Sequence, residues 1–351
     1  MEGFSPPTQK VEFSNQIFAV EFSPYEWSQN LICLGLSTEI IVGVVKFQED
    51  QPDEEEDKSE TEKCVDDECI EFQPLREFHH ETRVQALAWS PDSSIIVMPR
   101  LIRFCSAGSD HKLRLINSDL VNSDGVQILT GHTDYINAIA FHPDGHLIAS
   151  ASDDHTCRLW NIEDDGRYIF HLDSPAMSVC WHPEEPKKLI VGEKAGRIRL
   201  YNAIEGTAIL SVDAGGGGAQ TRSLTYPIQP LPLTSAHWSL SNPQMLAALV
   251  GSGAKGCELV LWDLARPSQP VDARVIHHGV GRCLRFCPSS DLVVATVCQP
   301  GAVLRVTHLR SSHPLLTSNL QVYGGLTWHS RLPYVCAASD RKLCFWKIAP
   351  K

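Results

Sequence analysis

The sequence of 351 residues has no run of about eighteen apolar residues, which is the length that a membrane-spanning helix needs. Its N-terminus, MEGFSPPTQKVEF, lacks the basic start and apolar stretch of a secretory signal, and no Asn-x-Ser/Thr glycosylation acceptor occurs along the chain. It also lacks a basic stripe of the kind that binds nucleic acid. We therefore expect neither a membrane-inserted nor a secreted protein, and no direct contact with nucleic acid.

Metal and disulfide chemistry is poorly supported as well, although the chain holds twelve cysteines. Most of them stand singly in strand-like segments, where a free cysteine behaves as a small buried apolar residue. Cys64 and Cys69 lie close together in a polar segment, but no second pair of ligands accompanies them. We expect no metal site and no cofactor.

One segment, residues 131–162, has the pattern of a WD repeat. Gly131 and His132 open it, Asp154 precedes Trp160 by six residues, and short runs of alternating apolar residues lie between them. A unit of this kind cannot bury its apolar face alone and must stack on copies of itself. The sequence should therefore contain further repeats.

Weaker copies of the repeat occur along the whole chain. An apolar-x-aromatic pattern, followed by Ser, His or Cys and usually by Pro, marks the innermost strand of each copy. The copies are 40 to 67 residues apart, and the shortest spacings match one four-stranded propeller blade. The seven aromatic positions are Phe22, Trp89, Phe141, Trp181, Trp238, Phe286 and Trp328. They predict an all-β chain that forms a single seven-bladed WD40-type β-propeller over residues 1–351.

The end of the chain predicts how the ring closes. The sequence stops just after the third strand-like run of the last blade, residues 342–348, so that blade lacks an outer strand. Residues 9–13 precede the first innermost strand and have no blade of their own. We expect this N-terminal strand to complete the last blade, because closure removes an open sheet edge.

Blade three offers the residues of the buried polar network that pins a WD blade. His132, Asp154 and Trp160 can join with Ser150 or Ser152. Buried polar groups are tolerated only when they are satisfied, so we expect such a network to be kept whole or lost together.

The other blades keep less of this network. Blade two offers His80 and Asp110 but has Ile116 in the Trp position, and blade seven keeps Asp340 and Trp346. Blades four to six are expected to rely on apolar packing. Since the His and Asp residues recur with the repeat, we interpret them as structural residues and not as acid–base pairs.

The negative charge of the chain is concentrated in one segment. Residues 49–71 hold thirteen Asp or Glu and two Lys, which accounts for −11 of the net charge of −12. Such a like-charged run cannot bury enough apolar surface to fold. We expect a disordered insertion between blades one and two, and a solvated loop without function is the simpler alternative to a binding site for a basic partner.

Two glycine-rich segments resemble nucleotide-binding motifs without their context. Residues 251–256 match GxGxxG, but a strand-like run follows where a phosphate-binding helix would have to begin. Residues 215–218 are four glycines with no following Lys-Ser or Lys-Thr. We therefore expect no catalytic site, and the chain is predicted not to be an enzyme.

Segments beyond the generic repeat carry a resemblance to a known family. The most specific are FHHETRV, GHTDYIN and SPAMSVCWHPEE, and the similarity runs from about residue 18 to residue 346. In these segments the chain resembles the small thirty-seven-kilodalton WD-repeat nucleoporins of the vertebrate nuclear-pore Y-complex. The acidic insertion, the run of four glycines and the blade-six sequence depart from that family.

The resemblance implies a non-enzymatic scaffold subunit in the nucleus, at the nuclear envelope and in the nuclear pore complex. The implied partners are the large propeller-plus-helical subunit of the Y-complex short arm and other Y-complex nucleoporins, without self-association. Roles in pore assembly, in mRNA and protein transport, and at kinetochores in mitosis are also implied. The alternative is a WD40 peptide-reading adaptor, such as a histone-tail or degron receptor, which would need an acidic or aromatic pocket at the central mouth of the ring.

Three exposed aromatic residues are candidates for partner binding, because interface energy concentrates in a few such anchors. Tyr25 and Trp27 follow the first innermost strand, and Tyr135 precedes the innermost strand of blade three. The simpler alternative for Trp27 and Tyr135 is that each covers the end of its own blade.

Overall fold

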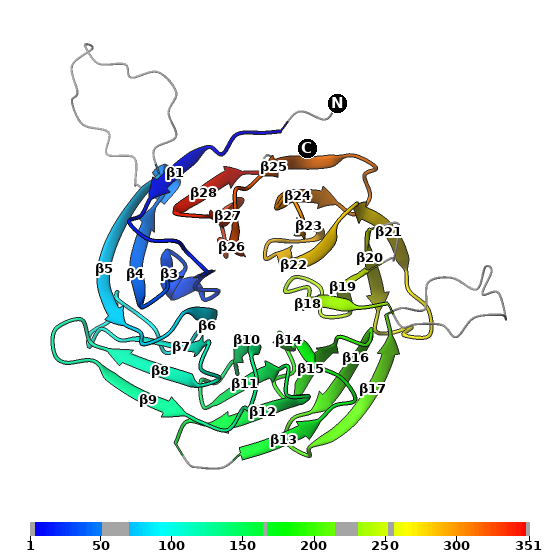
Figure 1. Cartoon of the computed structure of the whole chain (residues 1–351), viewed down its shortest axis with the longest axis horizontal. Coiled ribbons are helices and arrows are strands. Elements are labelled where there is room, and N and C mark those ends of the chain that lie inside the picture. The colour runs from blue at the N-terminus through cyan, green and yellow to red at the C-terminus, as the bar shows by residue number, and fades with distance from the viewer. Residues whose placement is uncertain (1–3, 51–69, 164–166, 215–230, 252–255, 349–351) are drawn as a thin grey trace, which may run out of the picture.

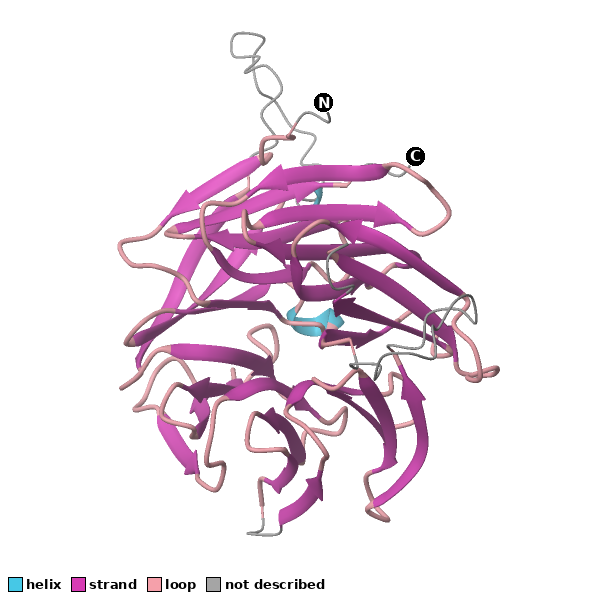
Figure 2. Cartoon of the chain, turned by 45° about the vertical axis from the view of Figure 1, so that its right-hand side comes forward, coloured by secondary structure: helices cyan, strands magenta, loops and turns pink. Residues whose placement is uncertain are grey.

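Seven radial β-sheets surround one axis in the computed structural model (Figure 1). The structure describes residues 4–50, 70–163, 167–214, 231–251 and 256–348, and these residues form twenty-eight strands. They also form two 3₁₀ turns, Glu26–Ser28 and Gln48–Asp50, and no α-helix (Figure 2). No helix in this part of the chain is long and apolar enough to cross a membrane. The predicted seven-bladed β-propeller is confirmed.

Each blade is a four-stranded antiparallel sheet whose strands we call a, b, c and d from the axis outwards. Blade one comprises β2 (Ala19–Phe22), β3 (Leu31–Gly35), β4 (Glu39–Lys46) and β5 (Glu71–His79). Blade two comprises β6 (Val84–Trp89), β7 (Ile102–Gly108), β8 (Leu113–Ser118) and β9 (Gly125–Leu129). Blade three comprises β10 (Ile136–Phe141), β11 (Leu147–Ser152), β12 (Thr156–Asn161) and β13 (Arg167–His171). Blade four comprises β14 (Ala176–Trp181), β15 (Lys188–Glu193), β16 (Arg197–Asn202) and β17 (Thr207–Asp213).

The remaining blades follow the same order. Blade five comprises β18 (Leu233–Trp238), β19 (Met245–Gly251), β20 (Cys257–Asp263) and β21 (Asp272–His277). Blade six comprises β22 (Val280–Cys287), β23 (Ser290–Gln299), β24 (Val303–His308) and β25 (Pro314–Asn319). Blade seven comprises β26 (Tyr323–Trp328), β27 (Tyr334–Ser339), β28 (Lys342–Lys347) and, as its d strand, β1 (Gln9–Glu12).

The N-terminal strand closes the ring as the sequence predicts. β1 pairs antiparallel with β28, and Gln9 lies opposite Phe345. Figure 1 shows this segment running along the outside of β28. Further towards the N-terminus, the Ser5 N–H donates to the carbonyl of Thr317 at 2.7 Å, so the segment also contacts the outer strand of blade six. Closure thereby satisfies the backbone of an edge that would otherwise be open.

The acidic insertion lies within blade one, and its predicted position between blades one and two was wrong. It connects β4 to β5, and β5 pairs with β4 from Glu71 opposite Lys46 to His79 opposite Glu39. A repeat such as residues 131–162 holds only strands a, b and c of its blade, so the end of a repeat is not the end of a blade and the d strand follows it. Residues 51–69 of the insertion, with Cys64 and Cys69, lie outside the described residues.

One apolar cluster lies at each of the seven junctions between neighbouring blades. Residues of a strand alternate between its two faces, so each sheet contributes side chains to both adjoining clusters. All seven aromatic residues that marked the innermost strands are buried in these clusters, with at most 6% of their surface exposed. The core is therefore continuous around the ring.

The loops of the ring lie on two opposite faces, because successive strands run in opposite directions. The loops between strands a and b and between strands c and d lie on one face, which we call the ab face. The loops between strands b and c and the connections between blades lie on the other, which we call the bc face. This division decides which predicted surface residues can act together.

Candidate functional site

The residues expected to form a network in blade three lie together. His132 donates from Nδ1 to Asp154 Oδ2 at 2.7 Å, and its Nε2 is 2.7 Å from Ser150 Oγ. Trp160 donates its indole N–H to the same Ser150 Oγ at 2.8 Å. Ser150 therefore bridges His132 and Trp160, whereas Ser152 contacts only backbone groups beside the network.

The charges of this network follow from its burial. Burial lowers the pKa of His132, which keeps the imidazole neutral, so Ser150 donates its hydroxyl proton to Nε2. Burial alone would raise the pKa of Asp154, but hydrogen bonds from Thr156 and His132 lower it below its usual value. The neutral His132 is held by the ionised Asp154 on one side and by Ser150 on the other. This arrangement orients the loop before β10, and neither ring nitrogen is left free to act as a base.

The polar network in blade two differs from the His80–Asp110 network expected from the sequence. His80 Nε2 is 3.2 Å from Ser106 Oγ, but the structure does not join His80 to Asp110 directly. Asp110 instead binds the guanidinium of Arg114, at 3.0 and 2.8 Å. This pairing outweighs the effect of burial and lowers the pKa of Asp110 to about 2. Sequence reasoning missed Arg114, which is only 3% exposed.

Polar networks also occur in blades four and six, where the prediction of apolar packing alone was wrong. Glu193 is fully buried in blade four, accepts the backbone N–H of Asp173 at 3.1 Å, and lies 2.6 Å from Arg199 Nε. In blade six, His277 Nε2 is 2.8 Å from Thr296 Oγ1. These pairs form without the full set of His, Ser, Asp and Trp at their usual spacing, so the repeat pattern did not reveal them.

The two residues predicted in blade seven do not form one network. Trp346 donates its indole N–H to the carbonyl of Ser5, at 3.5 Å, on the N-terminal segment. Asp340 lies in the turn between β27 and β28, with a φ of +58°, and its carbonyl accepts the Ile17 N–H at 2.9 Å. Both residues therefore help to hold the N-terminal segment against blade seven.

Histidines on the ab face connect neighbouring blades, and sequence reasoning did not assign them this role. In each case an imidazole edge packs on the aromatic residue of the next innermost strand. The pairs are His142 with Trp181 at 4.6 Å, His182 with Trp238 at 4.5 Å, and His329 with Phe22 at 5.5 Å between ring centroids. The His that follows the aromatic residue in FHP, WHP and WHS was the available signal.

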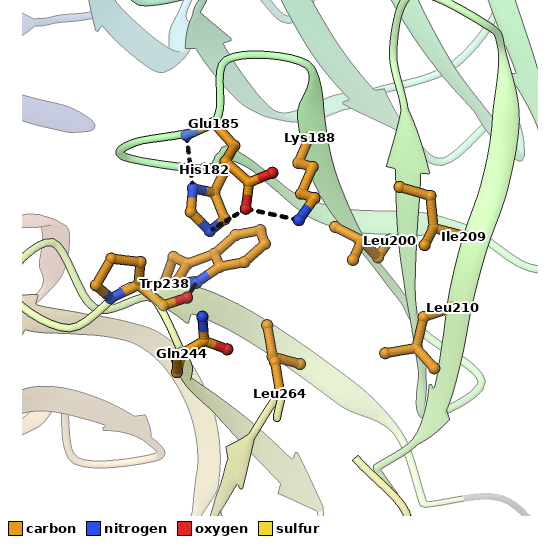
Figure 3. A pocket seen from close by; sticks show the side chains of 10 residues that line it. His182, Glu185, Lys188, Leu200, Ile209, Leu210, Trp238, Gln244 and Leu264 are labelled. Carbon is orange, nitrogen blue, oxygen red and sulfur yellow. Dashed lines mark hydrogen bonds and ion pairs between the residues drawn. The ribbon is translucent and has the colours of Figure 1, made fainter. Parts of the chain in front are cut away.

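A cavity of about 290 Å³ opens on the ab face between blades four and five. Figure 3 shows His182, Glu185 and Lys188 above Trp238, with the apolar side chains of the outer strands to one side. Lys188 Nζ is 2.6 Å from Glu185 Oε1, and His182 Nδ1 accepts the Glu185 N–H at 2.9 Å. These three groups are occupied with one another and with backbone, so their chemistry is structural.

The central mouth of the ring contains an internal ion pair. Glu21 on β2 and Arg285 on β22 come from blades one and six, which are not neighbours, and their charged groups are 3.9 Å apart. Burial raises the pKa of Glu21 to about 7, against the opposing effect of Arg285. The acidic group that a peptide reader would need here is already compensated within the chain.

The predicted surface aromatics lie on opposite faces of the ring. Tyr25 and Trp27 stack with 5.4 Å between ring centroids, and Trp27, 48% exposed, donates to the carbonyl of Pro91 at 2.8 Å on the ab face. Tyr135, 45% exposed, packs on His111 on the bc face. Trp27 and Tyr135 therefore cannot belong to one interface patch on a single face.

An exposed apolar loop lies in the same connection between β6 and β7 as Pro91, whose carbonyl accepts the Trp27 indole N–H, and it was not recognised from the sequence. Residues 95–100, between β6 and β7, are closed by paired backbone hydrogen bonds of 2.8 Å between Ser94 and Leu101. The side chains of Ile96, Val97 and Met98 are 77%, 64% and 77% exposed. Whether the apolar residues of segment 89–101 are buried or exposed depends on how the loop packs against neighbouring blades. The spacing of apolar residues along the sequence does not indicate this.

Comparison with known proteins identifies related chains along nearly the whole length. The family model "WD domain, G-beta repeat" matches residues 72–117 and 124–161. Nucleoporin Nup37 of Mus musculus is 38% identical over 342 residues, which is 96% of this chain and 95% of the relative. Nucleoporin Nup37 of Homo sapiens is 37% identical over the same coverage, and that of Drosophila melanogaster is 41% identical over 76% of this chain and 78% of its own length.

Proposed function

The chain belongs to the family of the WD-repeat nucleoporin Nup37, and from this premise we propose that it binds the large propeller-plus-helical subunit of the Y-complex short arm. As a member of this family the chain is a non-enzymatic nucleoporin scaffold of the nuclear pore. The finer proposal names its partner within the pore. Other Y-complex nucleoporins would then be reached through that subunit.

The observation that carries the proposal is an exposed apolar surface on a rigid ring. Ile96, Val97 and Met98 project from a closed loop in the connection that Trp27 contacts, and exposed apolar residues gathered in this way mark protein interaction sites. The titratable clusters of the described ring are paired internally, as in blade three and at the central mouth. A platform with an apolar contact surface is the function that this arrangement supports best.

Transport of mRNA and protein, pore assembly and a mitotic role at kinetochores follow as parts of the same proposal. Each would be a property of the assembled complex, because the ring supplies contact surface and no chemistry. Depletion of the chain, followed by imaging of pore number, poly(A) RNA export and chromosome alignment, tests these roles. A normal result for one of them, with complete depletion, removes that role from the proposal.

The peptide-reading adaptor is less well supported. It requires an acidic or aromatic pocket at the central mouth, and Glu21 there is compensated by Arg285 at 3.9 Å. Binding of histone-tail peptides to the purified ring, lost on Glu21→Gln, would favour the adaptor over the scaffold.

The direct test is a binding measurement between the purified chain and the purified large subunit. Trp27→Ala and Tyr135→Ala are compared separately, because each reports on one face of the ring. Loss of affinity in one folded variant identifies the face that binds. Failure of the intact chain to bind the large subunit contradicts the proposed partner.

A further inference from the structure

The charge of the ring is unevenly distributed over its loops. Outside the acidic insertion, the described ab-face loops of blades one to four contain nine acidic and two basic residues, whereas those of blades five to seven contain three basic and no acidic ones. The described loops of the whole bc face contain seven acidic and four basic residues. The loops of this half of the ab face therefore carry an excess of acidic residues, even without the acidic insertion.

The exposed apolar loop lies within this acidic half of the ab face. Glu26 is exposed next to Trp27, and Asp92, whose side chain is 42% exposed, follows Pro91. Asp144, 53% exposed, extends the acidic surface onto blade three, where Gly145 lies against Pro91 and Asp92. Arg103 pairs with Asp92 at 2.6 Å and Arg100 is exposed within the loop itself, so three acidic residues lie near the loop against two basic ones.

The loop is held in place before any partner arrives. Ile95 packs into the apolar cluster between blades one and two, which fixes one side of the loop. Ser93 Oγ donates to the carbonyl of Arg103 at 2.7 Å and accepts its N–H at 3.0 Å. An apolar loop whose base is fixed in this way loses less conformational entropy on binding than a free loop, which favours its use as an anchor.

We infer that the ab face of blades one to four binds a basic amphipathic segment of a partner protein, with Ile96, Val97, Met98 and Trp27 as the apolar anchor. The segment presents aliphatic or aromatic residues to the anchor and Lys or Arg to the acidic surface around it. The apolar and acidic residues of the surface define this class of segment. Only the assignment of the segment to the large short-arm subunit rests on the proposed function.

The sign of the charge selects this class of partner. An electronegative surface repels nucleic-acid phosphates and anionic lipid headgroups, so neither can bind there through its charge. Complementary charge accelerates association and makes it salt-dependent, whereas the buried apolar contacts determine how long the complex lasts. A basic segment without apolar residues would therefore bind weakly.

The first experiment uses a defined probe, a synthetic amphipathic helix of Leu and Lys about eighteen residues long, or five turns. Its affinity for the full chain is measured by calorimetry at about 50 and about 200 mM NaCl. A matched peptide with Ser in place of Leu keeps the charge and removes the apolar face. We expect the Leu peptide to bind at least tenfold more tightly than the Ser peptide, and both to weaken as salt rises.

The triple variant Ile96→Ser, Val97→Ser and Met98→Ser tests the anchor. These side chains are mostly exposed, so the variant should fold, which circular dichroism and thermal unfolding verify. The matched control is Val275→Ser, Val280→Ser and Val322→Ser, which removes three apolar residues exposed at 46%, 56% and 44% in blade five, in blade six and between blades six and seven. We expect the first variant to lose at least tenfold in affinity for the Leu peptide and the control to bind as the wild type does.

Equal binding by both variants, or equal binding of the Leu and Ser peptides, overturns the inference. The same variants are then measured against the purified large short-arm subunit. If the wild type binds this subunit and the loop variant binds equally well, the inference fails while the proposed function stands. If the peptide results hold but the subunit does not bind the wild type, the proposed partner fails while the surface assignment stands.

Discussion

Removal of the Ser150 hydroxyl is expected to destabilise the ring more than removal of the Ser152 hydroxyl, two positions further along the same strand. Ser150 Oγ is fully buried and accepts the Trp160 indole N–H at 2.8 Å while it lies 2.7 Å from His132 Nε2. Ser150→Ala removes the hydroxyl that pairs with His132 Nε2 and the acceptor of this Trp160 hydrogen bond.

The size of the effect follows from the cost of unsatisfied buried groups. An unsatisfied buried group at His132 costs about 1–3 kcal/mol and the lost Trp160 hydrogen bond about 0.5–1.5 kcal/mol, so Ser150→Ala should lower the free energy of unfolding by about 2–4 kcal/mol. Ser152 Oγ donates to the carbonyl of Asp134 and accepts the Asp154 N–H, both at 3.2 Å. These are weaker contacts near the end of the strand, and Ser152→Ala should cost about 1 kcal/mol.

The assay is urea-induced unfolding followed by tryptophan fluorescence, with the slope of the transition fitted for each variant. His132→Ala and Asp154→Ala complete the set, each with an expected cost of about 1–3 kcal/mol. The double variant should cost less than the sum of the two, by at least about 0.5 kcal/mol, because both residues act in one network. Strict additivity, or equal costs for the two serine variants, would refute the network.

Four further predictions address the other parts of the ring. Burial lowers the pKa of His277 to about 3, so the unfolded chain takes up this proton first and stability is lost as the pH falls below about 6.5. The loss at pH 4.5 should be about 3 kcal/mol, and His277→Gln should flatten the measured dependence of unfolding on pH. Deletion of residues 1–14 should lower the melting temperature by several degrees and promote aggregation, and an unchanged melting curve would contradict closure by β1. Glu193→Ala should cost about 2–3 kcal/mol in urea unfolding, because it removes the carboxylate that accepts the Asp173 and Ser174 N–H groups and leaves Arg199 with Asp173 alone, whereas a cost below about 1 kcal/mol would show that the network is unimportant. Replacement of residues 51–69 by a short Gly-Ser linker should change affinity for the large subunit less than twofold (about 0.4 kcal/mol) at physiological salt, because we expect from the sequence that this charge is solvated and therefore screened, and a larger loss would assign a role to the insertion.

The blade count and ring closure could be predicted from the sequence because they depend on repetition. The aromatic residue of each innermost strand, from Phe22 to Trp328, recurs at blade spacing because every blade must bury the same position. Ring closure could be predicted because the last blade lacked an outer strand and a strand-like segment at the N-terminus had no blade of its own. Both arguments use only the order of strands along the chain.

The networks and the binding surface were less predictable because they depend on pairs of residues from different loops. Arg114 satisfies Asp110 in blade two, and Glu193 satisfies backbone N–H groups in blade four, although neither residue belongs to the repeat pattern. Trp27 and Tyr135 looked equivalent in the sequence as exposed aromatics. Their separation onto opposite faces follows only from the direction of the strands that precede and follow them.

The same direction rule explains how a small ring can act as a scaffold. Loops on the ab face and the bc face extend from the same strands, so a partner held on one face leaves the other accessible. The seven apolar clusters and the His–aromatic contacts between blades keep the loops of blades one to four in fixed relative positions. An apolar loop whose base is fixed before binding needs only a complementary segment in its partner, and the acidic groups around it determine that this segment should be basic.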